Sequence, residues 1–136
     1  MTTATSGARR SICVTGEVDR PRALHFDELL QLSAVERRVQ LVCARGEISD
    51  VVMRGVALIH VFELARVRGT ACMAVFTCSD GYQEGLSLAD LIQQEAFLAY
   101  WVDKEQEGEP DSLPRLAVPG GGASKWAKGI HTIQLC

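Results

Sequence analysis

The apolar residues of this chain change their spacing repeatedly along the sequence, and this limits the folds open to it. Segments with the ~3.6-residue period of an amphipathic helix are short, and helices are predicted at residues 26–32, 56–67 and 88–93. Strand-like segments, alternating or continuously apolar, are more numerous, at residues 11–18, 37–43, 71–78, 96–102, 115–118 and 130–135. Helices and strands do not alternate regularly. The pattern therefore predicts an α+β fold of mixed sheets with short helices, not a doubly wound parallel sheet.

Local signals define the ends of several elements. Asp27 and Glu28 fall in the first turn of the first helix, where negative charge is stabilising. Ser87 is a candidate N-cap of the last helix, with Asp90 at the capping-box position. The middle helix carries an apolar stripe predicted to face the core: Leu58, Val61, Phe62 and Ala65. Two connections are predicted from their polar and glycine residues, a loop over residues 44–54 and a turn over residues 79–81.

Length and composition predict one domain. The chain has 136 residues, of which 47% are hydrophobic and 23% charged, as in a globular domain. Residues 1–10 are small and polar and are predicted to be a disordered leader to a domain over residues 11–136. The net charge of -3 gives no reason to expect nucleic acid as a partner. No apolar stretch approaches the ~20 residues of a membrane span, and the start lacks the apolar core of a secretory signal, so a cytoplasmic protein is expected.

The cysteines and histidines show no metal-binding spacing. The five cysteines are spaced irregularly, without a C-x-x-C pair. In a reducing cytoplasm we expect three of them to be buried packing residues, Cys13, Cys72 and Cys78, and the last residue, Cys136, to fray. The three histidines lie far apart in sequence and are expected at the surface or packed rather than as ligands: His25, His60 and His131.

Three features carry a chemical signal. Cys43 ends a predicted strand and opens a loop containing Arg45, whose guanidinium would favour the thiolate. Asp80 and Tyr82 lie in a turn. Three adjacent glycines lie among basic residues in a segment that could cradle an anion: Arg115, Gly120, Gly121, Gly122, Lys125 and Lys128. On physical grounds alone, a flexible loop with solvated lysines explains this last segment equally well.

These segments, taken in order, resemble the oxidoreductase molybdopterin-binding domain of the sulfite oxidase family. The resemblance spans residues 11–135 and rests on several pieces in the right order: residues 13–21 (CVTGEVDRP), the helix at 26–32, Leu41-Val42-Cys43, residues 54–58 (RGVAL), the turn Ser79–Tyr82, residues 96–100 and the closing block at 114–135. The chain departs from the family in having Met53 where tryptophan is usual, and Ala44-Arg45-Gly46-Glu47 after the cysteine. Its loop at residues 103–113 is acidic rather than glycine-rich.

The resemblance implies a molybdenum–molybdopterin cofactor and a role for each candidate residue. Cys43 would be the metal ligand and catalytic residue, since a soft thiolate suits a sulfur-bound centre. Arg115, Lys125 and Lys128 would hold the pterin phosphate. The other implied cofactor-binding residues are Arg45, Asp80, Tyr82, Gly120, Gly121 and Gly122. Such a centre performs oxygen-atom transfer or two-electron reduction.

A second hypothesis stays open at this point. The same fold could have lost the cofactor and act as a small-anion or protein-binding module, because fold does not imply function. Full enzymes of the family carry further sequence before the equivalent of Ser11, and its lack here favours this hypothesis. Cys43 and the two lysines, Lys125 and Lys128, favour the first hypothesis, a domain that binds the molybdenum cofactor. Enzyme activity, substrate, redox partner and oligomeric state are not readable from these residues.

Overall fold

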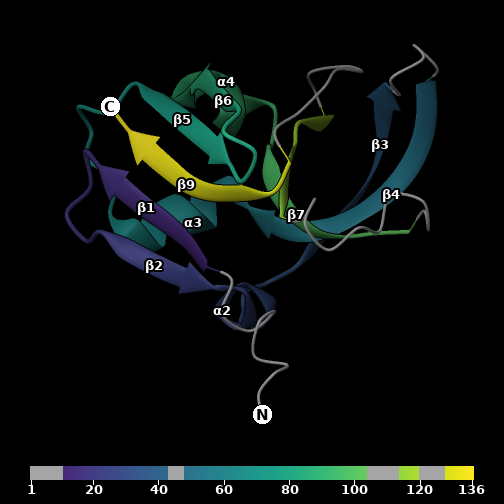
Figure 1. Cartoon of the computed structure of the whole chain (residues 1–136), viewed down its shortest axis with the longest axis horizontal. Coiled ribbons are helices and arrows are strands. Elements are labelled where there is room, and N and C mark those ends of the chain that lie inside the picture. Colours follow the sequence, from purple (N-terminus) through teal and green to yellow (C-terminus); the bar gives the residue numbers. More distant parts are fainter. Residues whose placement is uncertain (1–10, 43–47, 104–113, 120–127) are drawn as a thin grey trace.

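The computed structural model describes residues 11–42, 48–103, 114–119 and 128–136, which form two β-sheets with three short helices (Figure 1). One sheet has five strands in the order β2-β1-β9-β5-β6. These strands are β1 (Ser11–Gly16), β2 (Arg22–His25), β5 (Met73–Cys78), β6 (Gln83–Ser87) and β9 (Ile130–Leu135). The other has four strands in the order β3-β4-β7-β8. They are β3 (Val35–Val42), β4 (Ile48–Ala57), β7 (Phe97–Val102) and β8 (Arg115–Ala117). This is the α+β architecture with mixed sheets that the sequence predicted.

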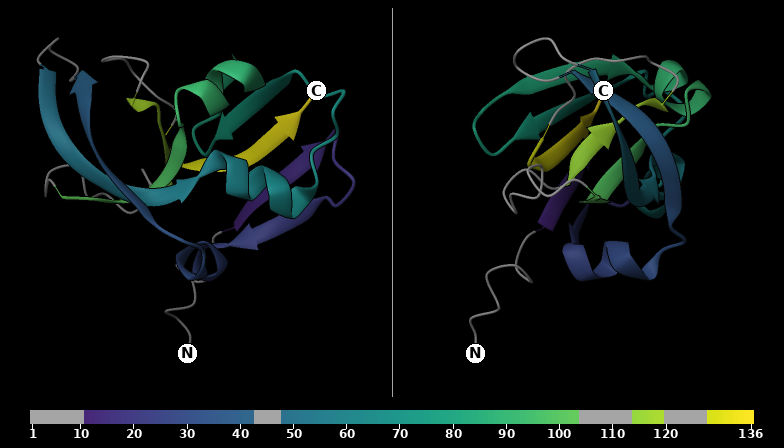
Figure 2. Two further views of the ribbon diagram at one scale, coloured as in Figure 1. Left: turned by 180° about the vertical axis from the view of Figure 1, so that it is seen from behind. Right: turned by 90° about the vertical axis from the view of Figure 1, so that its right-hand side faces the viewer.

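The five-stranded sheet packs one face against helix α3 (Leu58–Ala65) (Figure 2). Its central pair, β1 and β9, is parallel and joins the two ends of the described chain, whereas its other pairs are antiparallel. The predicted apolar stripe of α3 is confirmed, because all four residues are buried: Leu58, Val61, Phe62 and Ala65. The stripe packs into one continuous core with inward residues of the sheet such as Val14, Phe76 and Ile133.

The four-stranded sheet is antiparallel throughout and begins with a long hairpin that projects to one side of the molecule (Figure 1). Strands β3 and β4 stay in register from Val35 opposite Gly55 to Val42 opposite Ile48. The prediction of a loop over residues 44–54 is therefore wrong from residue 48 onward. Polar residues and a glycine interrupt the apolar pattern of β4. Pairing with β3 and β7 nevertheless supplies the backbone hydrogen bonds that stabilise it as a strand.

The middle helix begins later than predicted, because Val56 and Ala57 still belong to β4. Gly55 explains how β4 can lie so close to β7. A Cβ atom at this position would overlap the backbone carbonyl of Leu98, so only glycine fits. The close approach fixes the point at which the chain leaves the sheet and enters α3.

The predicted starts of the two other helices are confirmed. Helix α2 (Phe26–Gln31) has Asp27 and Glu28 in its first turn, and the Glu28 carboxylate accepts a hydrogen bond from the His25 backbone N–H at 2.8 Å. Helix α4 (Leu88–Gln93) is capped by Ser87, whose hydroxyl oxygen accepts a hydrogen bond from the Asp90 backbone N–H at 3.3 Å. The short strands β2 and β6 were not predicted, since both are too short or too polar to show alternation.

Three of the four cysteine predictions that the structure can test are wrong. Cys78 is buried as expected, but Cys13 and Cys72 are exposed. Cys13 lies on the outer face of β1, between the inward-facing Ile12 and Val14, so its strand position decides its exposure. Cys136 does not fray, because its backbone exchanges two hydrogen bonds with that of Met73, both 2.9 Å long. The histidines His25, His60 and His131 are all at the surface.

Candidate functional site

The two sheets are joined where β8 meets the start of β9. The backbone N–H of Ile130 donates a hydrogen bond to the carbonyl of Pro114 at 3.0 Å. Next to it, Arg115 and Lys128 form an isolated antiparallel bridge. These contacts bring together two segments that belong to different sheets.

Arg115 and Lys128 are the two candidate phosphate-binding residues that the structure describes, and it brings them together. Residues directly opposite in an antiparallel pair project their side chains to the same face. Arg115 is only 5% exposed, the one charged residue in the core of the described chain, while Lys128 is exposed. A buried guanidinium is costly to desolvate, and this sets Arg115 apart from the exposed Lys128.

The predicted turn lies beside this bridge. Asp80 and Tyr82 interact directly, since the Asp80 carboxylate accepts a hydrogen bond from the Tyr82 backbone N–H at 3.0 Å. The Ser79 backbone N–H donates to the carbonyl of Gly129 at 2.9 Å, which attaches the turn to the residue after Lys128. A short series of backbone contacts thus ties four candidate residues to one end of the five-stranded sheet: Asp80, Tyr82, Arg115 and Lys128. The Tyr82 side chain is half exposed.

Two further residues, Cys78 and Glu84, belong to this region, although the sequence did not predict them to be there. Cys78 ends β5, is 2% exposed, and its thiol is hydrogen-bonded by the Lys128 backbone. Burial raises the pKa of the Cys78 thiol, and the charges of Asp80 and Glu84 raise it further. The Glu84 carboxylate also raises the pKa of Tyr82. Glu84 could not be found from the sequence because β6 itself was not recognised.

The remaining candidate residues lie outside the described residues: Cys43, Arg45, Gly120, Gly121, Gly122 and Lys125. The described part of this region combines a buried guanidinium, an ammonium, two carboxylates and a thiol. Such a set can bind a ligand that has an anionic group together with hydrogen-bond donors. Within the described ranges there is no cluster of three metal-ligating side chains of the His, Cys, Asp or Glu type.

Comparison with known proteins shows the family of the chain. The sequence matches the oxidoreductase molybdopterin-binding domain over residues 4–136. The chain belongs to this family. The match covers nearly the whole chain, so its fold is that of a domain of this family. None of the helices in the described ranges is long and apolar enough to cross a membrane.

Two relatives of this family member extend the comparison. The chain is 27% identical to the oxidoreductase YuiH of Bacillus subtilis over 128 residues, which are 87% of this chain and 62% of that protein. Its fold resembles that of the sulfane dehydrogenase SoxCD from Paracoccus pantotrophus with a TM-score of 0.82 at 17% identity. That match covers 95% of this chain and 38% of the other. The chain therefore spans less than two thirds of the length of either relative.

Proposed function

We propose that this domain binds a molybdenum–molybdopterin cofactor and is a molybdenum-dependent oxidoreductase acting in the cytoplasm. The observation that carries the proposal is the buried guanidinium of Arg115 paired through the backbone with Lys128. A buried cation beside an exposed one suits a phosphate group, because guanidinium binds phosphate oxygens with two parallel hydrogen bonds. Membership of the molybdopterin-binding family supports a phosphate that belongs to the pterin cofactor.

The described residues fit such a cofactor by their chemistry. The pterin ring carries amino and ring N–H donors, and the carboxylates of Asp80 and Glu84, which both lie near Cys78, could accept hydrogen bonds from them. The phosphate at the other end of the cofactor requires cations, which Arg115 and Lys128 supply. One region with both kinds of group therefore matches a ligand that has donors at one end and an anion at the other.

Each candidate residue has a proposed role. Arg115, Lys128 and Lys125 would hold the phosphate, and the backbone N–H groups of Gly120–Gly122 would add hydrogen bonds. Asp80 and Tyr82 would orient the pterin. Cys43 would ligate the metal as a thiolate, with Arg45 favouring the deprotonated form. When bound, the cofactor would supply two-electron or oxygen-atom-transfer chemistry, and the domain would supply orientation.

The test is the cofactor content of protein purified from a host that makes molybdopterin. Metal analysis should find molybdenum, and oxidation of the released pterin should give its fluorescent product. Cys43→Ser should abolish the molybdenum, whereas Cys13→Ser, which removes an exposed thiol on β1, should leave it unchanged. The proposal fails if the wild-type chain carries neither molybdenum nor pterin while a known molybdenum enzyme from the same host is loaded.

A further inference from the structure

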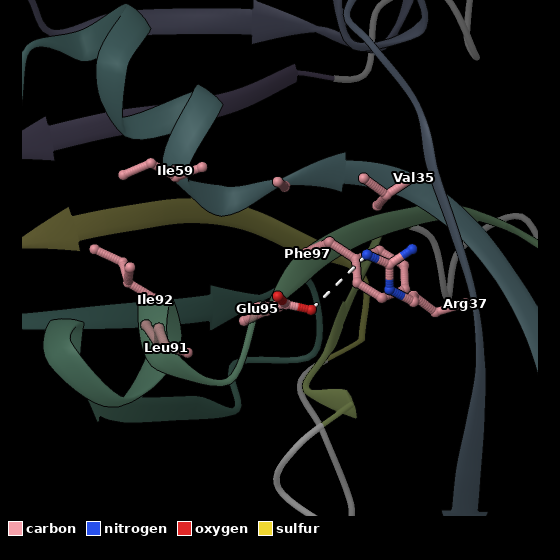
Figure 3. Close-up of a pocket in the computed structure, with 9 residues that line it drawn as sticks. Val35, Arg37, Ile59, Leu91, Ile92, Glu95 and Phe97 are labelled. Atoms are coloured by element: carbon pink, nitrogen blue, oxygen red, sulfur yellow. Dashed lines mark ion pairs between the residues drawn. The ribbon is translucent and has the colours of Figure 1, made fainter.

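A pocket separate from the candidate cofactor residues lies beside helices α3 and α4. It is a pocket of about 250 Å³ between the start of β3, helix α3 and helix α4 (Figure 3). Its apolar lining consists of Val35, Ala57, Ile59, Leu91, Ile92, Ala96 and Phe97. None of the residues proposed to bind the cofactor lines it. The pocket exposes large apolar side chains at its rim, since Ile59 and Ile92 are 39% and 47% exposed.

Two residues of opposite charge, Arg37 and Glu95, also line this apolar pocket. Figure 3 shows their side chains pointing toward one another, Arg37 from β3 and Glu95 from the turn between α4 and β7. Their closest nitrogen and oxygen atoms are 3.8 Å apart, which is too long for a direct hydrogen bond. Both side chains are largely exposed, and an ion pair of this kind is weak in water. A ligand carrying both charges can therefore replace the pair with two shorter contacts.

The backbone at Glu95 gives an independent reason to regard its side chain as functional. Glu95 has a φ of 58°, in the left-handed region, directly after the last residue of α4 and its C-cap Gln94. Glycine is the usual residue at such a position, because it adopts this conformation without steric cost. A non-glycine residue in a strained conformation beside a pocket suggests that its side chain has a function there.

We infer that this pocket binds a free α-amino acid with an apolar side chain, of the size of leucine, methionine or phenylalanine. Arg37 would bind the carboxylate, Glu95 the ammonium group, and the apolar lining the side chain. A ligand with only a carboxylate would be repelled by Glu95, and one with only an amine by Arg37. The volume corresponds to about eight water molecules, which suits a ligand smaller than a typical drug.

Titration of the wild-type protein tests the charge requirement, followed by calorimetry or by the chemical shifts of labelled protein. The probes are L-leucine, 4-methylpentanoate, which lacks the amine, and leucinamide, which lacks the carboxylate. Leucine should bind saturably, and each singly charged analogue about tenfold or more weakly. Alanine should also bind more weakly, because it leaves the apolar pocket unfilled. Absence of saturable leucine binding at millimolar concentration, or equal binding of 4-methylpentanoate, would overturn the inference.

Variants test the two charged residues. Arg37→Gln and Glu95→Gln should each weaken leucine binding about tenfold. Glu95→Gly removes the carboxylate at a backbone position that glycine prefers, so its loss of binding cannot be ascribed to misfolding. Arg38→Gln is the matched control, since Arg38 is exposed on the opposite face of β3 and does not line the pocket. Unchanged affinity in both Glu95 variants would contradict the site. Cofactor content should be the same in all of these variants.

Discussion

The backbone of Arg115 in β8 pairs with that of Lys128 just before β9, and this bridge joins the two sheets at the candidate cofactor site. One side chain of the pair is buried and the other exposed. The same bridge sets Lys128 against the buried thiol of Cys78. A single contact between sheets thus links a cation pair, a thiol and the turn at Asp80.

Replacing the two cations should lower cofactor content unequally. Arg115→Lys keeps the charge but loses the planar fork that matches a phosphate, so we expect about a tenfold lower pterin content per chain. Lys128→Gln should lower it less, roughly threefold, because an exposed charge is screened by salt. Metal analysis and pterin fluorescence measure the cofactor content of both variants.

Arg20→Gln is the control for this pair. Arg20 is exposed and follows β1 at the end of the five-stranded sheet remote from Lys128. Its replacement should leave cofactor content unchanged, with circular dichroism checking that each variant is folded. An equal loss in Arg20→Gln and Lys128→Gln, which each remove one positive charge, would show that general charge, not the pair, decides binding.

Thiol reactivity should distinguish Cys43 from the other cysteines. We expect iodoacetamide at neutral pH to modify Cys43 ahead of Cys13 and Cys72 in cofactor-free protein, because the proposed role of Arg45 is to favour the reactive thiolate. Cys13 and Cys72 are suitable references, since both are exposed. Peptide mapping by mass spectrometry measures the order. If Cys43 stays unmodified in the folded protein while Cys13 reacts, it is not an accessible metal ligand.

Cys78 should make the protein less stable at alkaline pH. Burial raises the pKa of its thiol above the ordinary value of 9.0 in the folded state. The unfolded chain therefore releases this proton first, and the free energy of unfolding falls as the pH rises above about 9. Below that pH the thiol is protonated in both states and contributes no such slope.

Urea unfolding between neutral and alkaline pH tests this assignment. Cys78→Ala should flatten the alkaline decline, at a cost of about 1 kcal/mol at neutral pH for the lost packing. Cys13→Ala, at an exposed position, should keep the wild-type decline. Parallel pH profiles for Cys78→Ala and the wild type would rule out a contribution from Cys78.

Gly55→Ala should destabilise the fold by about 3 kcal/mol, because the added Cβ overlaps the Leu98 carbonyl and must push β4 away from β7. Gly69→Ala is the matched control, since a Cβ at Gly69 meets no atom within 4 Å. Urea midpoints compare the two variants. Similar midpoints would mean that the two strands can separate without cost.

Sequence alone identified the three helices, most of the strands and the family. The helices were readable because their apolar residues repeat with the helical period, as at Val61 and Phe62, and because their caps are local signals such as Ser87. The strand β9 was readable from simple alternation. These signals depend on residues close in sequence, so they do not require knowledge of the tertiary structure.

The tertiary structure decided what depends on distant partners. Strand β4 exists because β3 and β7 supply its hydrogen bonds, which its polar residues do not reveal. The exposure of Cys13 follows from the face of β1 that the core leaves open. The burial of Arg115 beside Lys128 comes from the meeting of two sheets. Local periodicity determines the elements, whereas burial and pairing depend on contacts between residues far apart in the chain, which only the folded molecule defines.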